Sequence, residues 1–520
     1  MFKKLVSLAI ATAAISGTAL ANVPKGWPNY ITMGGVTLAS TDKNFKGINA
    51  DFIMKYAGNG AGDRGHIAMP IFTYNTAKLA EVLTSDNRHN VKPLMVAYTG
   101  QMSGGTSFFD FSDKNLKLHF ADLILMAQVL NLPFLKNVGY GSIVLNPDLL
   151  GMVQQEKLFN EKTGNLNGLG KLNNALALSQ AVWFITKKHN WHFKLSSGKS
   201  FVATGTPIQI MENIENGAYK DKGVYSPWDL QQSFQAQAEH IMSKAPNKTN
   251  LILPTFASNF LGWIQATNYA LRKYAPNVTF GWQLNIWSSG TANWIHNKLH
   301  KDIVETPAQI QADTIKTADT SVDIIKKLGV YSGQYKPDFL AFDKYATDAT
   351  SSIGAGYWWN DWDWNRYMQW VKEISDKLGQ VPVMLWQEPG THILMGSHEV
   401  DKVHSSVFPN YLFGHSHIKL NRKYGAYNIN VALRSTNLQD DLYQCSKTST
   451  PKHDGCTIGQ YLEQGGYDYS RDHFRFLKSA NVFSVEFGEG NSTSISEYPR
   501  SDGGWLSKKV NNYEKHPVTI

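Results

Sequence analysis

The segment Val381-Pro382-Val383-Met384-Leu385-Trp386-Gln387-Glu388-Pro389-Gly390 decides the fold that we expect for this chain. An apolar, β-branched run ends there in Trp-Gln-Glu and is then broken by Pro-Gly. Short continuous apolar runs are typical of buried parallel strands, and α/β folds place their chemistry at the C-terminal ends of such strands. The segment therefore predicts a buried strand that carries Glu388 to a functional edge.

The same pattern recurs along the chain and alternates with amphipathic stretches. We expect strands at Ile31–Val36, Pro93–Tyr98, Ser142–Leu145, Leu251–Phe256, Val278–Trp287, Asp338–Asp343, Val381–Gln387 and Asn481–Phe487, with Pro207–Met211 as a ninth candidate. Helical spacing of apolar residues predicts helices at Leu172–Lys188, Asp229–Met242, Asn259–Tyr274, Ala308–Lys327 and Trp364–Leu378. About eight strand–helix units favour an α/β fold of the (β/α)8 TIM-like barrel type. No GxGxxG motif follows the first strand, which disfavours a dinucleotide-binding sheet.

Two stretches, 189–225 and 392–480, do not fit simple strand–helix units. They are rich in Gly, Asn, His and Tyr and predict long loops over the C-terminal face of the barrel, where loops set specificity. We therefore expect residues 22–520 to form a single elaborated barrel, with a loop-rich insertion at about 392–480.

The first 21 residues have the pattern of a bacterial secretory signal peptide. Lys3 and Lys4 precede a mostly apolar stretch, and Ala19-Leu20-Ala21 is a small-x-small cleavage site. The apolar part is too short for a convincing membrane anchor, and no later segment has membrane-spanning length without a charge. The sequence therefore predicts a periplasmic or secreted protein that does not insert into a membrane.

Composition and charge restrict the partners. The formal net charge of +8 is spread along the chain, so we expect no nucleic-acid partner. Aromatic residues make up 12% of the chain, which fits a large packed core as well as a surface that binds sugars. The oligomeric state is left open, and no cofactor is expected.

The two cysteines, Cys445 and Cys456, lie in a polar segment that also contains Pro451 and Gly455. In an oxidising compartment we expect them to form one disulfide that closes this loop. They do not form a CxxC motif, so a metal or redox role has little support.

Four acidic residues lie at the ends of predicted strands: Asp148, Asp343, Glu388 and Glu486. Acidic residues are depleted within strands, so this placement exceeds chance expectation, although each could instead be an ion pair or a helix cap. Cleavage of a glycosidic bond needs two carboxyl groups, one as acid and one as nucleophile or base. We predict Glu388 and Asp343 as the core catalytic pair, with Asp148 as the third candidate and Glu486 as a substrate contact.

Amide and aromatic side chains near these carboxylates are of the kind that sugar rings require. Aromatic faces stack on the apolar faces of sugars, and amides bind hydroxyl groups. The alternation in 280–287 places Trp282 on one face and the amides on the other, where they would point into a barrel. In 357–364 four Trp fall within seven residues and favour an exposed platform. The predicted substrate contacts are Gln283, Asn285, Trp287, Tyr345, Trp358, Trp386, Gln387 and His392.

Three segments together resemble a known family. The motif Asn146-Pro147-Asp148-Leu149-Leu150-Gly151 is similar to the Glu-Pro-Asp-x-Leu-Gly signature of the TIM-barrel glycoside hydrolases of family 6, the cellobiohydrolases and endoglucanases. Gly262-Trp263 and Leu385–Gly390 resemble later signatures of that family. Asn146 replaces its usual acidic residue, and Gly104-Gly105 to Asp110 is a loose counterpart of its loop with a catalytic Asp. The resemblance implies glycosidic bond cleavage without a specified substrate.

A metal-dependent phosphoesterase is an alternative. Gly414-His415-Ser416-His417 matches the Gly-His-x-His ending of calcineurin-like enzymes, and Gly62-Asp63-Arg64-Gly65 is similar to another of their motifs. The remaining motifs of their two-metal cradle are missing. The His-rich 392–417 segment could still bind a single zinc or copper ion.

A third possibility is a barrel that binds sugars without cleaving them, because aromatic platforms do not separate binding from hydrolysis. The separation of the carboxyl groups would distinguish the two. The sequence as a whole favours a secreted glycoside hydrolase that acts on oligo- or polysaccharides by a two-carboxylate mechanism. The sugar, the linkage and the stereochemical outcome are left open.

Overall fold

The computed structural model of the chain describes most of the expected domain. It covers residues 23–38, 42–58, 69–100, 111–248, 251–295, 306–345, 359, 361–391, 393–395, 398–400, 407–414, 472–488, 494–496 and 502–520. The predicted signal peptide, the two cysteines and most of the predicted 392–480 insertion lie outside these ranges.

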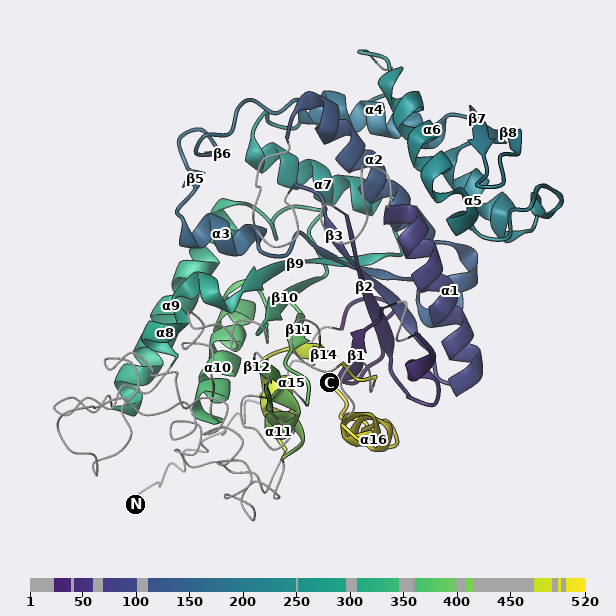
Figure 1. Cartoon of the computed structure of the whole chain (residues 1–520). Helices are drawn as coiled ribbons and strands as arrows, with labels where there is room; N and C mark the ends of the chain where they lie inside the picture. Colours follow the sequence, from purple (N-terminus) through teal and green to yellow (C-terminus); the bar gives the residue numbers. More distant parts are fainter. Residues whose placement is uncertain are drawn as a thin grey trace, which may run out of the picture.

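Eight parallel strands close into a barrel, and each strand pairs with its neighbours in chain order until β14 meets β1 (Figure 1). The expected (β/α)8 TIM-like fold is confirmed. The barrel strands are β1 (Thr32–Val36), β2 (Phe52–Gly58), β3 (Lys92–Tyr98), β4 (Ser142–Leu145), β9 (Thr279–Asn285), β10 (Phe339–Asp343), β11 (Val383–Glu388) and β14 (Val482–Phe487). Three short hairpins pair β5 (Phe159–Asn160) with β6 (Asn165–Leu166), β7 (His189–Lys194) with β8 (Ser200–Gly205), and β12 (Ile393–Met395) with β13 (His398–Val400).

Helices surround the barrel (Figure 1). They are α1 (Met69–Asn87), α2 (Asp113–Leu130), α3 (Leu149–Gln155), α4 (Asn174–Thr186), α5 (Pro207–Glu215), α6 (Gln231–Ser243), α7 (Phe260–Tyr274), α8 (Thr291–Trp294), α9 (Pro307–Lys327), α10 (Asp361–Lys377), α11 (Phe408–Phe413), α15 (Phe474–Ser479) and α16 (Trp505–Tyr513). Short 3-10 helices are η1 (Asp42–Phe45), η2 (Pro133–Val138), η3 (Lys220–Lys222), η4 (Pro227–Leu230) and η5 (Ile286–Ser289). Among the described residues, none of these helices is long and apolar enough to cross a membrane.

One of the eight predicted barrel strands was wrong, and one barrel strand was not predicted. Leu251–Phe256 forms no strand, Ile252 is 95% exposed, and β4 pairs directly with β9. The barrel strand that was not predicted is β2, between β1 and β3. Strand β2 was not predicted because Lys55 interrupts its apolar run. A charged residue is not expected in a strand that is buried on both faces.

The ninth candidate, Pro207–Met211, is helical and begins α5. Thr206 caps this helix in a reciprocal capping box with Gln209, and Pro207 occupies the first helical turn. Proline is favoured at that position because its fixed φ suits the helix and its missing N–H would have no intrahelical partner. The apolar run was short enough to be ambiguous between the two structures.

The prediction that 189–225 is a long loop over the C-terminal face of the barrel is also wrong. It folds into the β7–β8 hairpin and α5, and α5 packs on α2 and α4. Figure 1 shows β7, β8, α5 and α6 together at one side of the barrel, beyond α2 and α4. Trp191 of β7 stacks on Phe234 of α6 at a ring separation of 4.9 Å, so this unit has an aromatic core of its own.

The N-terminal end of the barrel is closed by aromatic packing around Trp27. Its ring meets Phe52 of β2 and Phe483 of β14 edge-on at 5.5 and 5.0 Å, and its Nε1 donates a hydrogen bond to Thr279 Oγ1 at 3.0 Å. A Cβ at Gly281 would lie 2.4 Å from the Phe339 ring, so glycine is required for this close packing. The barrel is therefore filled at this end.

Candidate functional site

Acidic and amide side chains gather at the C-terminal ends of the barrel strands. Asp343 ends β10, Glu388 ends β11, and Asp148 follows β4 directly before α3. Asn285 ends β9 and is the register partner of Asp343. Strands that lie far apart in the chain therefore bring these side chains to one end of the barrel, where TIM barrels place their active sites.

One amide group links two of the predicted catalytic carboxylates. Asn285 Nδ2 donates a hydrogen bond to Asp148 Oδ1 at 2.7 Å and another to Asp343 Oδ2 at 3.2 Å. The two N–H bonds of a primary amide diverge by about 120°, so ideal hydrogen-bond geometry at Asn285 corresponds to a separation of roughly 5 Å between the two bonded oxygens. Asn285 is fully buried and Asp343 is 2% exposed, whereas Asp148 is partly exposed. Substrate therefore has easier access to Asp148 than to the other two residues.

Asp148 is held in a strained conformation. Its φ is 72°, and that of Asn146 is 42°, both in the left-handed region that non-glycine residues rarely adopt. Its backbone N–H donates to Gln283 Oε1 at 2.9 Å, which fixes the turn against β9. Burial raises the pKa of Asp148, although the Asn285 bond acts in the opposite direction. Strained residues of this kind cluster at active sites.

The Asn146–Gly151 motif has a physical explanation in this turn. Asn146 Oδ1 accepts hydrogen bonds from Thr99 N at 2.8 Å, Thr99 Oγ1 at 3.0 Å and Gly100 N at 3.2 Å, and so ties the end of β3 to that of β4. A Cβ at Gly151 would lie 2.5 Å from Asn285 Oδ1 and 3.1 Å from the Trp287 ring. Gly151 therefore lets α3 approach Asn285.

Glu388 lies in a separate, fully buried environment. Its Oε1 accepts a hydrogen bond from Tyr367 of α10 at 3.1 Å. A register irregularity falls between Leu385 and Glu388, where Gln387 has a φ of 56°. Because of this bulge Glu388 is paired with Phe487 and meets a helix outside the barrel.

Burial raises the pKa of Glu388 well above its ordinary value. The Tyr367 hydrogen bond and the charge of Lys344 lower this pKa, and the charges of Asp343 and Glu486 raise it. Glu388 therefore interacts electrostatically with both Asp343 and Glu486. Lys344 itself is fully buried, and its Nζ lies 4.9 Å from the centre of the Trp359 ring.

Gln387 connects further strands to the site. Its backbone N–H donates to Glu486 Oε2 at 2.9 Å, and its side-chain amide donates to the Tyr56 hydroxyl of β2. The rings of Tyr56 and Trp386 lie 6.1 Å apart. The predicted contacts Trp386, Gln387 and Glu486 are therefore adjacent to one another.

Several residues of the site were missed by sequence reasoning. In the sequence, Tyr367 fits the helical spacing of apolar residues in α10 and gives no sign of a polar role. Tyr56 lies on β2, the strand that was not predicted. Lys344 follows Asp343 directly and was the one available signal. Trp287, in η5 directly after β9, and Tyr345, two residues after the end of β10, are partly exposed.

The predicted tryptophan platform is wrong for the tryptophans that the structure describes. Trp359 and Trp364 are fully buried, with ring centroids 4.7 Å apart. Helix α10 begins at Asp361, so Trp364 lies in the first turn of a helix and not in a loop. Trp358 and His392 lie outside the described residues, as do His415 and His417 of the phosphoesterase-like motif and Gly62–Gly65.

Comparisons with known proteins give little further information. No family model and no curated protein matches the chain. A solved structure of a glycoside hydrolase family 6 enzyme from Coprinopsis cinerea is similar over 67% of this chain and 68% of its own, at 12% sequence identity and a TM-score of 0.29. At that score the likeness supports neither a family assignment nor a function.

Proposed function

We propose that this chain is a glycoside hydrolase that cleaves oligo- or polysaccharides with Asp148 and Asp343 as its carboxyl pair. The observation that carries the proposal is the shared hydrogen bonding of both carboxylates to Asn285 Nδ2. It joins two carboxyl groups of different exposure at the C-terminal end of a barrel. Ideal amide geometry corresponds to roughly 5 Å between the bonded oxygens, which is compatible with the separation of about 5–5.5 Å used by retaining glycosidases.

Asp148 is suited to the role of general acid. Burial raises its pKa, so its carboxyl group keeps a proton at a higher pH than a solvated aspartate does. It is also the more exposed of the pair, where a leaving-group oxygen can reach it. In the first step Asp148 gives its proton to that oxygen while the glycosidic bond breaks.

Asp343 is suited to the role of nucleophile. Its Oδ2 is oriented by Asn285, and its oxygen forms a bond to the anomeric carbon as the leaving group departs. Water then attacks the glycosyl ester, Asp148 accepts the water proton, and the sugar and Asp343 carboxylate are released. The two steps consume one water and leave the enzyme unchanged.

Glu388 fits a supporting role better than the role in the catalytic pair that the sequence predicts for it. It is fully buried, and its hydrogen-bond partner is Tyr367, outside the barrel. Its electrostatic interaction with Asp343 means that its protonation state changes the field at the nucleophile. Among the described residues, the proposed sugar contacts remain Gln283, Trp287, Tyr345, Trp386, Gln387 and Glu486. Trp358 and His392 are proposed contacts from the sequence alone.

The signal-peptide pattern predicted for the first 21 residues would direct export, so we propose a periplasmic or secreted enzyme with a carbohydrate substrate. The experiment is a panel of purified oligo- and polysaccharides incubated with the exported form of the protein, with release of reducing ends as the readout. Parallel arms contain a metal chelator, and others replace the sugars with an aryl phosphate ester. Hydrolysis of a sugar polymer with and without chelator supports the proposal. Phosphate release that the chelator abolishes would establish the phosphoesterase alternative, and tight sugar binding without cleavage would establish a sugar-binding barrel.

A further inference from the structure

At the N-terminal end of the barrel, Asp51, His89 and Glu514 converge from three parts of the chain. Asp51 directly precedes β2, His89 lies in the connection from α1 to β3, and Glu514 follows α16. One ligand atom from each residue lies within 4.8 Å of the other two. Because all barrel strands are parallel, this cluster lies at the opposite end of the barrel from Asp148 and Asp343.

We propose that Asp51, His89 and Glu514 form a binding site for a divalent transition-metal ion, for which Zn²⁺ is the best fit. The set combines one imidazole with two carboxylates. Zn²⁺ accepts imidazole and carboxylate ligands, and sites with three protein ligands keep the fourth position open for water. The proposal does not depend on the hydrolase function.

The spacing of the ligand atoms suits a shared ion. His89 Nε2 lies 3.1 Å from Asp51 Oδ1. Two ligands of a tetrahedral Zn²⁺ with bonds of about 2.0–2.2 Å lie roughly 3.3–3.6 Å apart, so the Asp51–His89 pair needs little movement to admit the ion. The third ligand lies within electrostatic and hydrogen-bonding reach of Asp51 and Tyr30.

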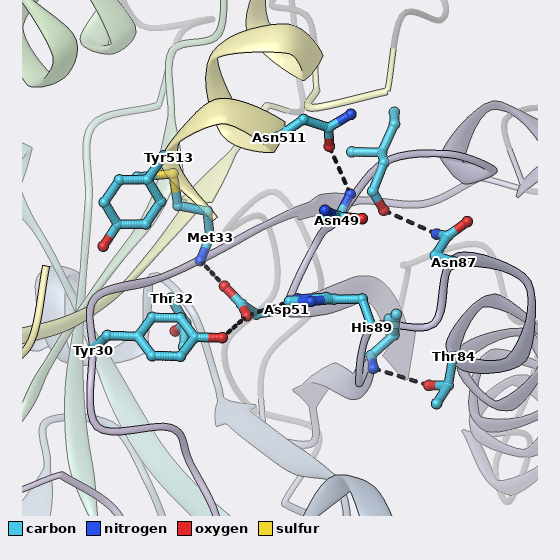
Figure 2. Close-up of polar contacts among 12 residues, drawn as sticks. Tyr30, Thr32, Met33, Asn49, Asp51, Thr84, Asn87, His89, Asn511 and Tyr513 are labelled. Carbon is cyan, nitrogen blue, oxygen red and sulfur yellow. Dashed lines mark hydrogen bonds and ion pairs between the residues drawn. The ribbon is translucent and has the colours of Figure 1, made fainter. Parts of the chain in front are cut away.

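The central carboxylate is pre-oriented by neighbouring groups (Figure 2). Met33 N donates to Asp51 Oδ2 at 2.7 Å, and the Tyr30 hydroxyl donates to Asp51 Oδ1 at 2.5 Å. Figure 2 shows Tyr30, Met33 and His89 directed at Asp51 from different sides. Hydrogen bonds of this kind around a ligand fix its orientation and strengthen metal binding.

An independent observation points to a missing partner. The Oε1 atom of Glu514 is buried, and within the described residues no hydrogen-bond donor reaches it. A buried carboxylate oxygen without a partner is costly, and so are two adjacent carboxylates; a cation bound to Asp51 and Glu514 would offset their repulsion. The Asp51 side chain is 3% exposed and the His89 side chain 20% exposed, so an ion can enter from the His89 side.

A bound ion would link both ends of the described domain. Asp51 is bonded to the start of β1, and Glu514 directly follows α16, in which the Tyr513 hydroxyl donates to Ile31 O at 2.7 Å. The ion would therefore fasten the C-terminal helix to the first two strands, at the end of the barrel where residues serve stability.

The test compares the wild-type protein with the variants H89A, E514Q and H89A/E514Q, and uses H192A as a control because His192 is exposed on β7. Each protein is stripped with chelator, dialysed against Zn²⁺, and analysed for bound zinc per chain and for Tm with and without Zn²⁺. Counting the difference from wild type removes zinc held elsewhere, including any at the His-rich 392–417 segment.

We expect the double variant to bind one Zn²⁺ fewer per chain than wild type and H192A. Zn²⁺ should raise the Tm of wild type by at least about 2 °C and that of the double variant less. In chelator, E514Q should unfold at the same temperature as wild type or higher, because it removes one of two adjacent carboxylates. Equal zinc content in wild type and the double variant would overturn the proposal, and so would equal Zn²⁺-dependent shifts in Tm. Dependence on Mn²⁺ in place of Zn²⁺ would retain the site and change its ion.

Discussion

Asp148 and Asp343 accept hydrogen bonds from the same nitrogen atom, the Nδ2 of Asn285, at 2.7 and 3.2 Å. The two aspartates come from strands that are not neighbours, and β9 lies between them with Asn285 at its end. A single amide therefore sets the spacing of the proposed catalytic pair.

Replacing Asn285 by alanine should lower kcat by about 10- to 100-fold, because the Asp343 carboxylate loses a charge-assisted hydrogen bond with a net value of about 1.5–3 kcal/mol and Asp148 loses the bond that orients it. Steady-state kinetics on the polymer found by the panel measure this effect. The matched control is N173A, since Asn173 Nδ2 also donates to a carboxylate, that of Asp113, but on an exposed surface. Equal kcat in wild type and N285A would show that the shared amide does not organise the reaction.

Replacing Asp148 by asparagine should remove the general acid. Activity of the wild type should fall as the pH rises through the raised pKa of Asp148, because the acid must be protonated to act. D148N should lose this alkaline limb and lose most of its activity on natural linkages. Aryl glycosides with acidic leaving groups need no proton, so they should be cleaved by D148N at rates much closer to wild type. Equal losses on both kinds of substrate would remove Asp148 from the acid role.

Replacing Glu388 by glutamine should change the pH dependence of stability. Burial raises the pKa of Glu388 well above its ordinary value of 4.5, so the folded protein holds a proton that the unfolded chain releases. The contribution of Glu388 to stability therefore falls as the pH rises above that ordinary value, by up to about 1.4 kcal/mol per pH unit. Below it, both states are protonated and the effect vanishes.

The E388Q variant should therefore unfold at higher urea concentration than wild type at pH 8 and at nearly the same concentration at pH 4. The amide oxygen introduced by this substitution can still accept the Tyr367 hydrogen bond, so the fold should persist. E156Q is the control, because Glu156 is exposed. Turnover should fall in E388Q through the altered field at Asp343, with residual activity. A parallel stability curve for wild type and E388Q across this pH range would mean that Glu388 is ionised in the folded protein.

The spacing of the pair predicts retention of anomeric configuration. Oxygens bonded to the two hydrogens of one amide lie about 5 Å apart, which leaves room for a covalent intermediate but not for a water between base and sugar. Proton NMR of the first product, recorded before mutarotation, identifies its anomer. Initial formation of the opposite anomer would assign the catalytic base to another carboxylate, with Glu388 as the next candidate.

Much of this site could be predicted from sequence because each strand end combines an apolar run with a polar residue. The ends of β4, β9, β10 and β11 follow that pattern, and the alternation around Trp282 correctly separates the helix-facing indole from the inward-facing amides. Trp282 packs on Trp263 of α7 at 5.7 Å and donates to Asn268. The alternation of side chains along a strand is enough to predict which of them face the helices and which face the barrel interior.

The remaining features depend on contacts that periodicity does not encode. Lys55 interrupts the β2 run, so Tyr56 was not recognised as a neighbour of Gln387. The bulge at Gln387 turns Glu388 toward Tyr367. The apolar run before Gln387 contains no residue pattern from which this bulge could be predicted. The segment 357–364 was assigned to a loop because the predicted helix started only at Trp364. In the structure α10 begins three residues earlier, at Asp361.

The most direct test of the central claim is the rate of polymer cleavage by wild type, D343N, D148N and N173A under identical conditions. We predict that wild type and N173A release reducing ends at the same rate, whereas D343N, which lacks the nucleophile, is slower by at least about 10⁴-fold with every leaving group. D343N with a circular dichroism spectrum like that of wild type and with wild-type activity would contradict the claim.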